Sequence, residues 1–113
     1  MYVYRVEHPD SGLGPFRHAP CEDPMDVAGH AIRRCLPVPQ DDGIHIPEDD
    51  WVCGLPHEDV IRVWFPMLDD LIRYGYVLRR YRINKRRVRA GKSGLQVIFK
   101  PRDASTVATL RAA

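Results

Sequence analysis

The sequence predicts an α+β fold in which a small, mostly antiparallel sheet of three to four strands carries two to three helices on one face. Strand-like alternation appears at residues 2–7, 76–83 and 95–100, and helical patterns occupy the stretch between the first and second of these segments. Strands at both ends of a chain with helices between them are typical of α+β folds. A length of 113 residues suffices for one hydrophobic core. We therefore expect one domain over residues 1–101, followed by a C-terminal tail or short helix over 102–113.

The elements of the first half follow from local signals. Residues 2–7 are mostly aromatic or β-branched and predict a strand, and the proline, aspartate, serine and glycine of 8–12 end it. Asp23 and Pro24 have the chemistry of a helix start, so a helix is expected from Pro24 to about Cys35. The proline- and aspartate-rich stretch 36–50 predicts a loop, and 51–54 a short extended segment.

The second half alternates helix and strand signals. A helix is expected from Pro56 until Pro66 breaks it. A second short helix, with apolar residues on one side, should end at Gly75, because glycine suits the left-handed conformation after a helix. Residues 76–83 and 95–100 are the remaining strands, with 88–90 either a short strand or loop. The first strand should lie beside one of these two. In the tail, Ser105 is a candidate cap for a short helix.

A core is expected between the helices and the sheet. Its predicted members are apolar residues from all of these elements: Trp64, Phe65, Leu68, Val77, Val97 and Phe99. Alternation in the strand over 76–83 places Arg79 on the same face as Val77 and Tyr81. If that face is buried, the Arg79 side chain must reach solvent along its stem or pair with an acid, for which Glu7 and Asp70 are candidates.

Charge is distributed unevenly along the chain. Residues 1–72 contain 5 basic and 14 acidic side chains, whereas residues 73–113 contain 12 basic and 1 acidic. Such asymmetry points to a charged partner, with mutual neutralisation of the two halves as the alternative. No apolar run is long enough to span a membrane, and the charged N-terminus differs from a signal peptide. A cytoplasmic protein, monomeric or homodimeric, is expected.

The basic half supplies the main candidate for a partner-binding surface. Six cations lie on the strand over 76–83 and on the residues that follow it: Arg80, Arg82, Lys85, Arg86, Arg87 and Arg89. Arginine matches phosphate and carboxylate groups with paired hydrogen bonds, and the interleaved Tyr74, Tyr76 and Tyr81 could stack on bases. A solvated strand edge that discourages aggregation is the alternative interpretation.

The acidic half supplies a secondary candidate, a loop that could mimic a phosphate backbone or simply remain solvated. Its acidic residues flank an apolar island at 44–46 and are Asp41, Asp42, Glu48, Asp49 and Asp50.

The sequence does not predict a catalytic or metal centre. His18 and Cys21 form the only pair at short ligand spacing, and no second pair completes a zinc site. Three cysteines without a secretion signal predict free thiols. No metal, cofactor or catalytic residue is expected. A small nucleotide-binding enzyme similar to an ADP-ribosyltransferase, using Tyr4 and Arg5 of the first strand, is the enzymatic alternative, although no Glu follows Glu58 to provide that family's catalytic acid.

Several short motifs together resemble a group of small phage and prophage proteins. These motifs cover most of residues 1–100 and are Tyr4-Arg5-Val6-Glu7, Gly12-Leu13-Gly14-Pro15-Phe16, Cys53-Gly54, Trp64-Phe65, Tyr74-Gly75-Tyr76 and Gln96-Val97-Ile98-Phe99. The arginine-rich segment 79–89 and the loop 37–50 depart from that pattern. The resemblance implies a phage-encoded protein acting in a bacterial host.

Small phage proteins of this charge polarity are often inhibitors of host defence, including anti-CRISPR proteins. The expected function is therefore a non-enzymatic binding protein that inhibits a host defence nucleoprotein complex through a charged surface. Its partner would be the host protein complex or its nucleic acid, and a nucleic-acid-binding accessory protein is a further alternative.

Overall fold

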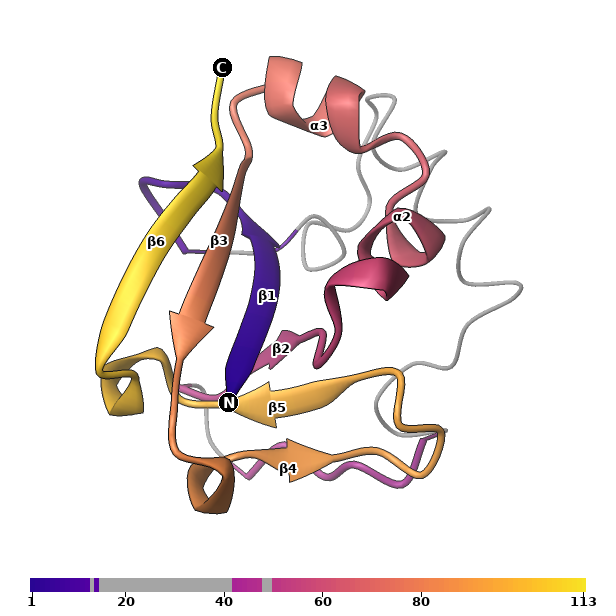
Figure 1. Cartoon of the computed structure of the whole chain (residues 1–113), viewed down its shortest axis with the longest axis vertical. Coiled ribbons are helices and arrows are strands. Elements are labelled where there is room, and N and C mark those ends of the chain that lie inside the picture. The colour runs from indigo at the N-terminus through magenta and orange to yellow at the C-terminus, as the bar shows by residue number, and fades with distance from the viewer. Residues whose placement is uncertain (13, 15–41, 48–49) are drawn as a thin grey trace.

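The computed structural model describes residues 1–12, 14, 42–47 and 50–113, and it contains two antiparallel three-stranded sheets (Figure 1). The first sheet has the order β1-β3-β6, and the second has the order β2-β5-β4. Their strands are β1 (Tyr2–Glu7), β2 (Val52–Gly54), β3 (Val77–Arg82), β4 (Arg89–Ala90), β5 (Val97–Phe99) and β6 (Thr106–Arg111). The predicted α+β class is confirmed, and β1 does pair with β3.

The helices of the described residues are short. They are η2 (Glu58–Val60), α2 (Ile61–Trp64), α3 (Leu68–Arg73), η3 (Lys85–Arg87) and η4 (Pro101–Asp103). Gly75, just after α3, has a φ of +97°, the left-handed conformation expected of a glycine that ends a helix. The helix predicted over residues 24–35 lies outside the described residues.

The strands divide between two sheets, whereas the sequence predicted one. The reason is that β3 has apolar side chains on both faces, so both faces need a covering layer. On one face Leu78 packs with α2 and α3; on the other, Tyr81 packs with Val97 and Phe99 of β5. In Figure 1, β4 and β5 run across the lower end of the first sheet, while α3 lies at its upper end.

The predicted core residues are all buried, but they do not form one cluster. Trp64, Phe65 and Leu68 lie in the helix-side cluster, and Val97 and Phe99 lie in the cluster between the sheets. The expectation of a single shared cluster is therefore wrong, because the first sheet separates the two groups.

A close approach of backbone joins β2 to β1. The backbone N–H of Tyr4 donates to the carbonyl of Leu55 at 2.8 Å, and the N–H of Leu55 donates back at 2.7 Å. A Cβ on Gly54 would overlap a Val3 methyl group and lie 2.8 Å from the Phe99 ring. Glycine is therefore needed at position 54 for the two sheets to pack.

The C-terminal tail forms a strand, not the short helix that Ser105 suggested. Residues 106–111 pair with β3 as β6, with Val107 opposite Tyr81 and Thr106 opposite Arg82. Three of these residues are β-branched, and the open edge of β3 offers hydrogen bonds that an isolated helical turn does not. The tail is thus part of the first sheet.

A buried polar row lies on the face of the first sheet that carries Tyr81. The Tyr81 hydroxyl donates to the Glu7 carboxylate, and Arg79 lies 3.8 Å from the other Glu7 oxygen. The predicted pairing of Arg79 with Glu7 is confirmed. Burial, together with the hydrogen bond to Glu7, raises the pKa of Tyr81 well above its usual range.

Candidate functional site

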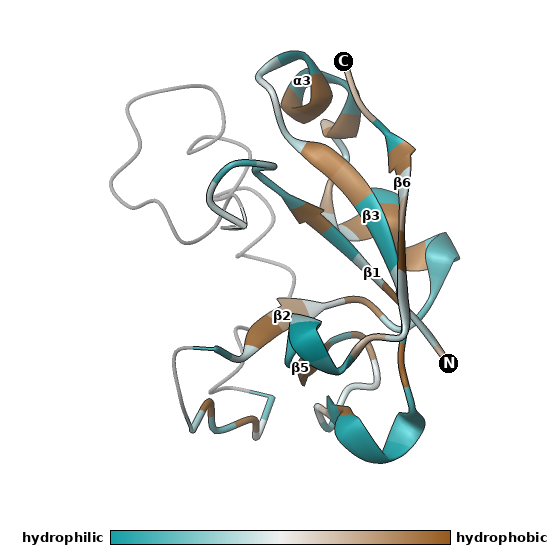
Figure 2. Ribbon diagram, turned by 90° about the vertical axis from the view of Figure 1, so that its left-hand side faces the viewer, coloured by the Kyte–Doolittle hydropathy of each residue, from teal (hydrophilic) through white to brown (hydrophobic). Residues whose placement is uncertain are grey.

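The basic residues after β3 are presented by a tight, capped turn. The Asn84 side chain accepts a hydrogen bond from the Arg86 backbone N–H at 3.0 Å, which caps η3 at its start. Lys85, Arg86 and Arg87 are all exposed, and η3 buries no residue. Local sequence thus turns three consecutive cations outward just beyond the end of the first sheet. In Figure 2 this segment is a hydrophilic turn at the lower end of the molecule.

The preceding strand adds two cations on one face. Arg80 and Arg82 project from the face of β3 that also carries Leu78, with Arg82 exposed and Arg80 half-buried. Arg82 lies directly opposite Tyr2 in the register of β1 and β3, and the Arg80 guanidinium lies 4.4 Å from the centre of the Tyr2 ring. We call Arg80, Arg82, Lys85, Arg86 and Arg87 the basic surface.

Arg89 lies apart from this set, on β4 of the second sheet. Its guanidinium is 4.6 Å from the centre of the Trp51 ring, and Lys100 contacts the same ring at 5.3 Å. Trp51 is buried with Ile44 and Ile98 on the outer face of that sheet. Cation–π contacts therefore hold Arg89 over its own sheet, while its charge remains exposed.

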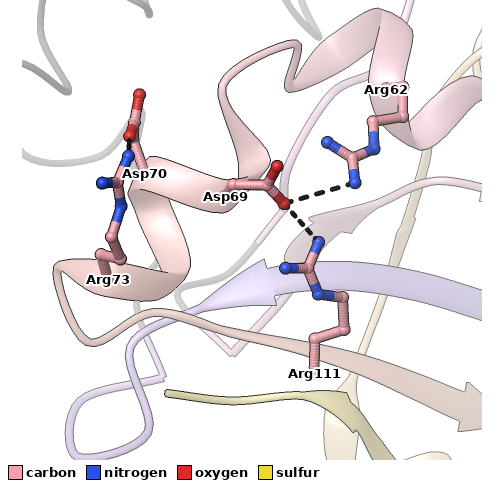
Figure 3. Close-up of polar contacts among 5 residues, drawn as sticks. All are labelled: Arg62, Asp69, Asp70, Arg73 and Arg111. Atoms are coloured by element: carbon pink, nitrogen blue, oxygen red, sulfur yellow. Dashed lines mark hydrogen bonds and ion pairs between the residues drawn. The ribbon is translucent and has the colours of Figure 1, made fainter.

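Within the described residues, none of the six predicted binding cations forms an ion pair with an acid. Cations elsewhere in that part of the chain do. Arg62 and Arg111 share Asp69 at 3.4 and 2.7 Å, and Arg73 pairs with Asp70 (Figure 3). Arg102 and Lys100 lie 3.1 and 3.7 Å from Asp50. The two Asp69 contacts lower the pKa of that carboxyl, the Arg111 hydrogen bond most strongly. Among the described residues, the cations of the basic surface and Arg89, like Lys92, form no such ion pair.

Two acids of the secondary candidate, the acidic loop, lie within the described residues, and both have partners in the fold. Asp42 is buried, and its carboxylate accepts hydrogen bonds from the Ser93 N–H at 2.7 Å, the Ser93 hydroxyl at 2.8 Å and the Gln96 amide at 3.1 Å. It therefore fixes the turn between β4 and β5 and is not available to a partner. Asp50 is paired with Lys100 and Arg102. Asp41, Glu48 and Asp49 lie outside the described residues.

The electrostatics of Asp42 agree with that structural role. Burial alone raises the pKa of this carboxyl, but the hydrogen bonds from Ser93 and Gln96, with the nearby Lys92 charge, outweigh burial and lower it. Asp42 is thus an ionised anchor inside the protein.

The tyrosines singled out from the sequence are mostly unavailable for stacking. Tyr76 and Tyr81 are buried, and Tyr74 is exposed but lies at the end of α3, away from the basic surface. The exposed aromatic residue beside the arginines is Tyr2, which sequence reasoning missed. The available signal was the position of Tyr2 at the first residue of the strand, outside the part of the strand that the helices cover.

The residues named for an enzymatic alternative have structural contacts here. Tyr4 is buried in the helix-side cluster. Arg5 is buried, and its guanidinium donates to the carbonyls of Cys53 at 2.6 Å and Gly12 at 2.8 Å. Both therefore help to join β1 to its neighbouring segments.

The described part of the chain contains no group of three metal-ligating side chains, and no helix long and apolar enough to cross a membrane. Cys53 forms no disulfide with another described residue. His18, Cys21 and Cys35 lie outside the described residues.

The family model described as "Bacteriophage T4 Y00F protein" matches residues 1–113. No curated protein and no solved structure matches the chain.

Proposed function

The chain belongs to the bacteriophage T4 Y00F protein family, and from this premise we propose that it is a non-enzymatic phage protein that binds the nucleic acid of a host nucleoprotein complex. The basic surface makes the contact with the nucleic acid. This binding inhibits a defence complex of the host, as anti-CRISPR proteins do. The observation that carries the proposal is the set of cations without acidic partners among the described residues.

Unpaired arginines favour a polyanion. Surface ion pairs contribute little to stability, so cations without acidic partners cost the fold little and remain available to an anionic partner. Here the acids of the described residues neutralise Arg62, Arg73, Arg79, Arg102 and Arg111 and leave the basic surface free. A phosphate backbone supplies the anions that these guanidinium groups match in geometry.

The same geometry favours the basic surface over the acidic loop. Asp42 is committed to Ser93 and Gln96, and Asp50 to two cations. A loop that mimics nucleic acid needs its carboxylates in solvent, and these two do not meet that need.

The proposal is tested by a matched pair of charge-reversed proteins. One carries Arg82→Glu and Arg86→Glu in the basic surface; the other carries Arg62→Glu and Arg73→Glu near α3. The two variants change net charge equally, so only the position of the change differs. Fluorescence anisotropy with labelled oligonucleotides measures binding, and thermal unfolding shows that both variants fold.

We expect the first variant to bind at least tenfold more weakly and the control to bind within about twofold of the wild type. With about five phosphate contacts, wild-type affinity for a single strand should fall about 100-fold between 50 and 200 mM salt. Equal losses in both variants would mean that net charge, not the basic surface, governs binding, and the proposal would fail.

Inhibition of defence is measured separately in cells. Plaque formation by a targeted phage is counted on bacteria with an active CRISPR-type system, with and without the wild type or either variant. Rescue of plaques by the wild type and the control, but not by the basic-surface variant, is expected. Rescue at protein amounts far below those of the defence complex would instead indicate an enzyme.

A further inference from the structure

One face of the first sheet is covered at one end and open at the other. Tyr4, Val6 and Leu78 are buried beneath the helices. Further along the same face, toward the start of β1 and the end of β3, Tyr2 keeps 44% of its surface exposed and Arg82 is exposed. Figure 1 shows this end of the sheet, near the N-terminus, at the opposite end from α3.

The open end combines an aromatic ring with two guanidinium groups. Arg80 stacks on the Tyr2 ring, and Arg82 lies directly across from it. The stack favours one orientation of the ring, since an aromatic face attracts a cation held within about 6 Å. An exposed ring that is already ordered loses little conformational freedom when a second planar group stacks on it.

The neighbouring strand, β6, adds no large side chain next to the two arginines. Thr106 lies opposite Arg82 and Ala108 lies opposite Arg80, so this part of β6 adds only small side chains to the open face. A chain lying across β1, β3 and β6 therefore meets Tyr2, two arginines and small residues, and the cations of η3 follow just beyond the end of β3.

We infer that this open end of the first sheet binds a single-stranded nucleic acid, with a base stacked on Tyr2 and its phosphates held by Arg80, Arg82 and η3. The inference rests on the proposed function and deepens it. Single strands are bound by aromatic platforms within a basic groove, because their unpaired bases expose a flat face to stack. Bases inside a duplex are already stacked on one another, so Tyr2 would contribute nothing to duplex binding.

The experiment compares two probes and three tyrosine variants. The probes are a 12-nucleotide oligothymidylate and a 12-base-pair duplex, both labelled for anisotropy. Tyr2→Ala removes the ring, Tyr2→Phe keeps it, and Tyr74→Ala removes another exposed tyrosine, at the end of α3. Thermal unfolding confirms that each variant folds.

The single strand should bind more tightly than the duplex. Tyr2→Ala should weaken single-strand binding about tenfold while changing duplex binding less than twofold. Tyr2→Phe and Tyr74→Ala should match the wild type. A photocrosslink from 5-iodouracil in the oligonucleotide should map to Tyr2 in the wild-type protein, which tests the contact without any substitution.

The binding experiment gives different results when this inference fails and when the proposed function fails. If single strand and duplex bind equally well and Tyr2→Ala changes neither, the stacking platform is overturned while nucleic-acid binding stands. If the wild type binds neither probe, both proposals fall. Binding to an acidic host protein in place of either probe would likewise overturn the inference.

Discussion

Replacement of Asp42 by alanine tests the structural role of this one residue of the acidic loop. The carboxylate accepts three hydrogen bonds, two from Ser93 and one from Gln96. A Cβ on Gly91 would overlap the Asp42 carboxylate, so the two residues are packed against each other. Removing the carboxylate should therefore loosen the turn between β4 and β5.

The magnitude follows from which donors can reach water. Ser93 is exposed, so its N–H and hydroxyl regain solvent partners when Asp42 is removed. Gln96 is only 3% exposed, so water does not readily replace the hydrogen bond that its amide donates to Asp42. A hydrogen bond to a charged group contributes about 1.5–3 kcal/mol, and the two bonds from Ser93 add a smaller amount. We expect Asp42→Ala to lower the free energy of unfolding by about 2–4 kcal/mol.

The assay is urea unfolding, repeated as the pH is lowered. Because the folded pKa of Asp42 lies below the ordinary value of 3.8, the stabilisation is complete above that value and is lost as the pH falls through the folded pKa. Asp42→Asn should remove this part of the acid dependence. An Asp42→Ala protein as stable as the wild type, but weakened in partner binding, would refute the reasoning and restore the acidic loop as a binding surface.

Three further predictions concern the core and the buried polar row. Gly54→Ala should destabilise by about 1–3 kcal/mol, since its Cβ would overlap Val3 and crowd Phe99, and unchanged urea unfolding would contradict this packing. Trp64→Ala should cost about 3–5 kcal/mol, because the side chain is buried beneath the first sheet; an unaltered thermal midpoint would remove it from the core. Tyr81 should make stability fall as pH rises above the ordinary tyrosine pKa of 10.0, because the unfolded chain loses this proton first. Alkaline unfolding of Tyr81→Phe should lack that loss, and an identical profile would show that Tyr81 does not carry it.

The sequence predicted the elements with strong periodicity and missed those decided by tertiary contacts. Alternation located β1 and β3, and Gly75 marked the end of α3. The tail was ambiguous because Ser105 can begin a helix, and only the open edge of β3 makes a strand of 106–111. Strand signals were present at 51–54, 88–90 and 95–100, but the pairing of these segments into a separate sheet depends on long-range contacts that local patterns do not specify.

The candidate site shows the same division between local and long-range information. The exposure of the cations at 82 and 85–87 could be predicted from their charge and from strand alternation, because it does not depend on contacts with distant parts of the chain. The role of Asp42 could not be read from a loop rich in aspartate, since its partners at 93 and 96 are about fifty residues away in the chain. Tyr2 was overlooked for a related reason: its exposure depends on where the helices stop covering the sheet.

The most direct test of the account is to map the binding surface residue by residue. Amide chemical shifts of the wild-type protein are followed by NMR as a 12-nucleotide single strand is added. The account predicts that the largest changes fall on Tyr2, on Arg80 and Arg82, and on residues 85–87, with little change in α3. Changes centred on α3 or on the loop around Asp42, or none at millimolar oligonucleotide, would contradict it.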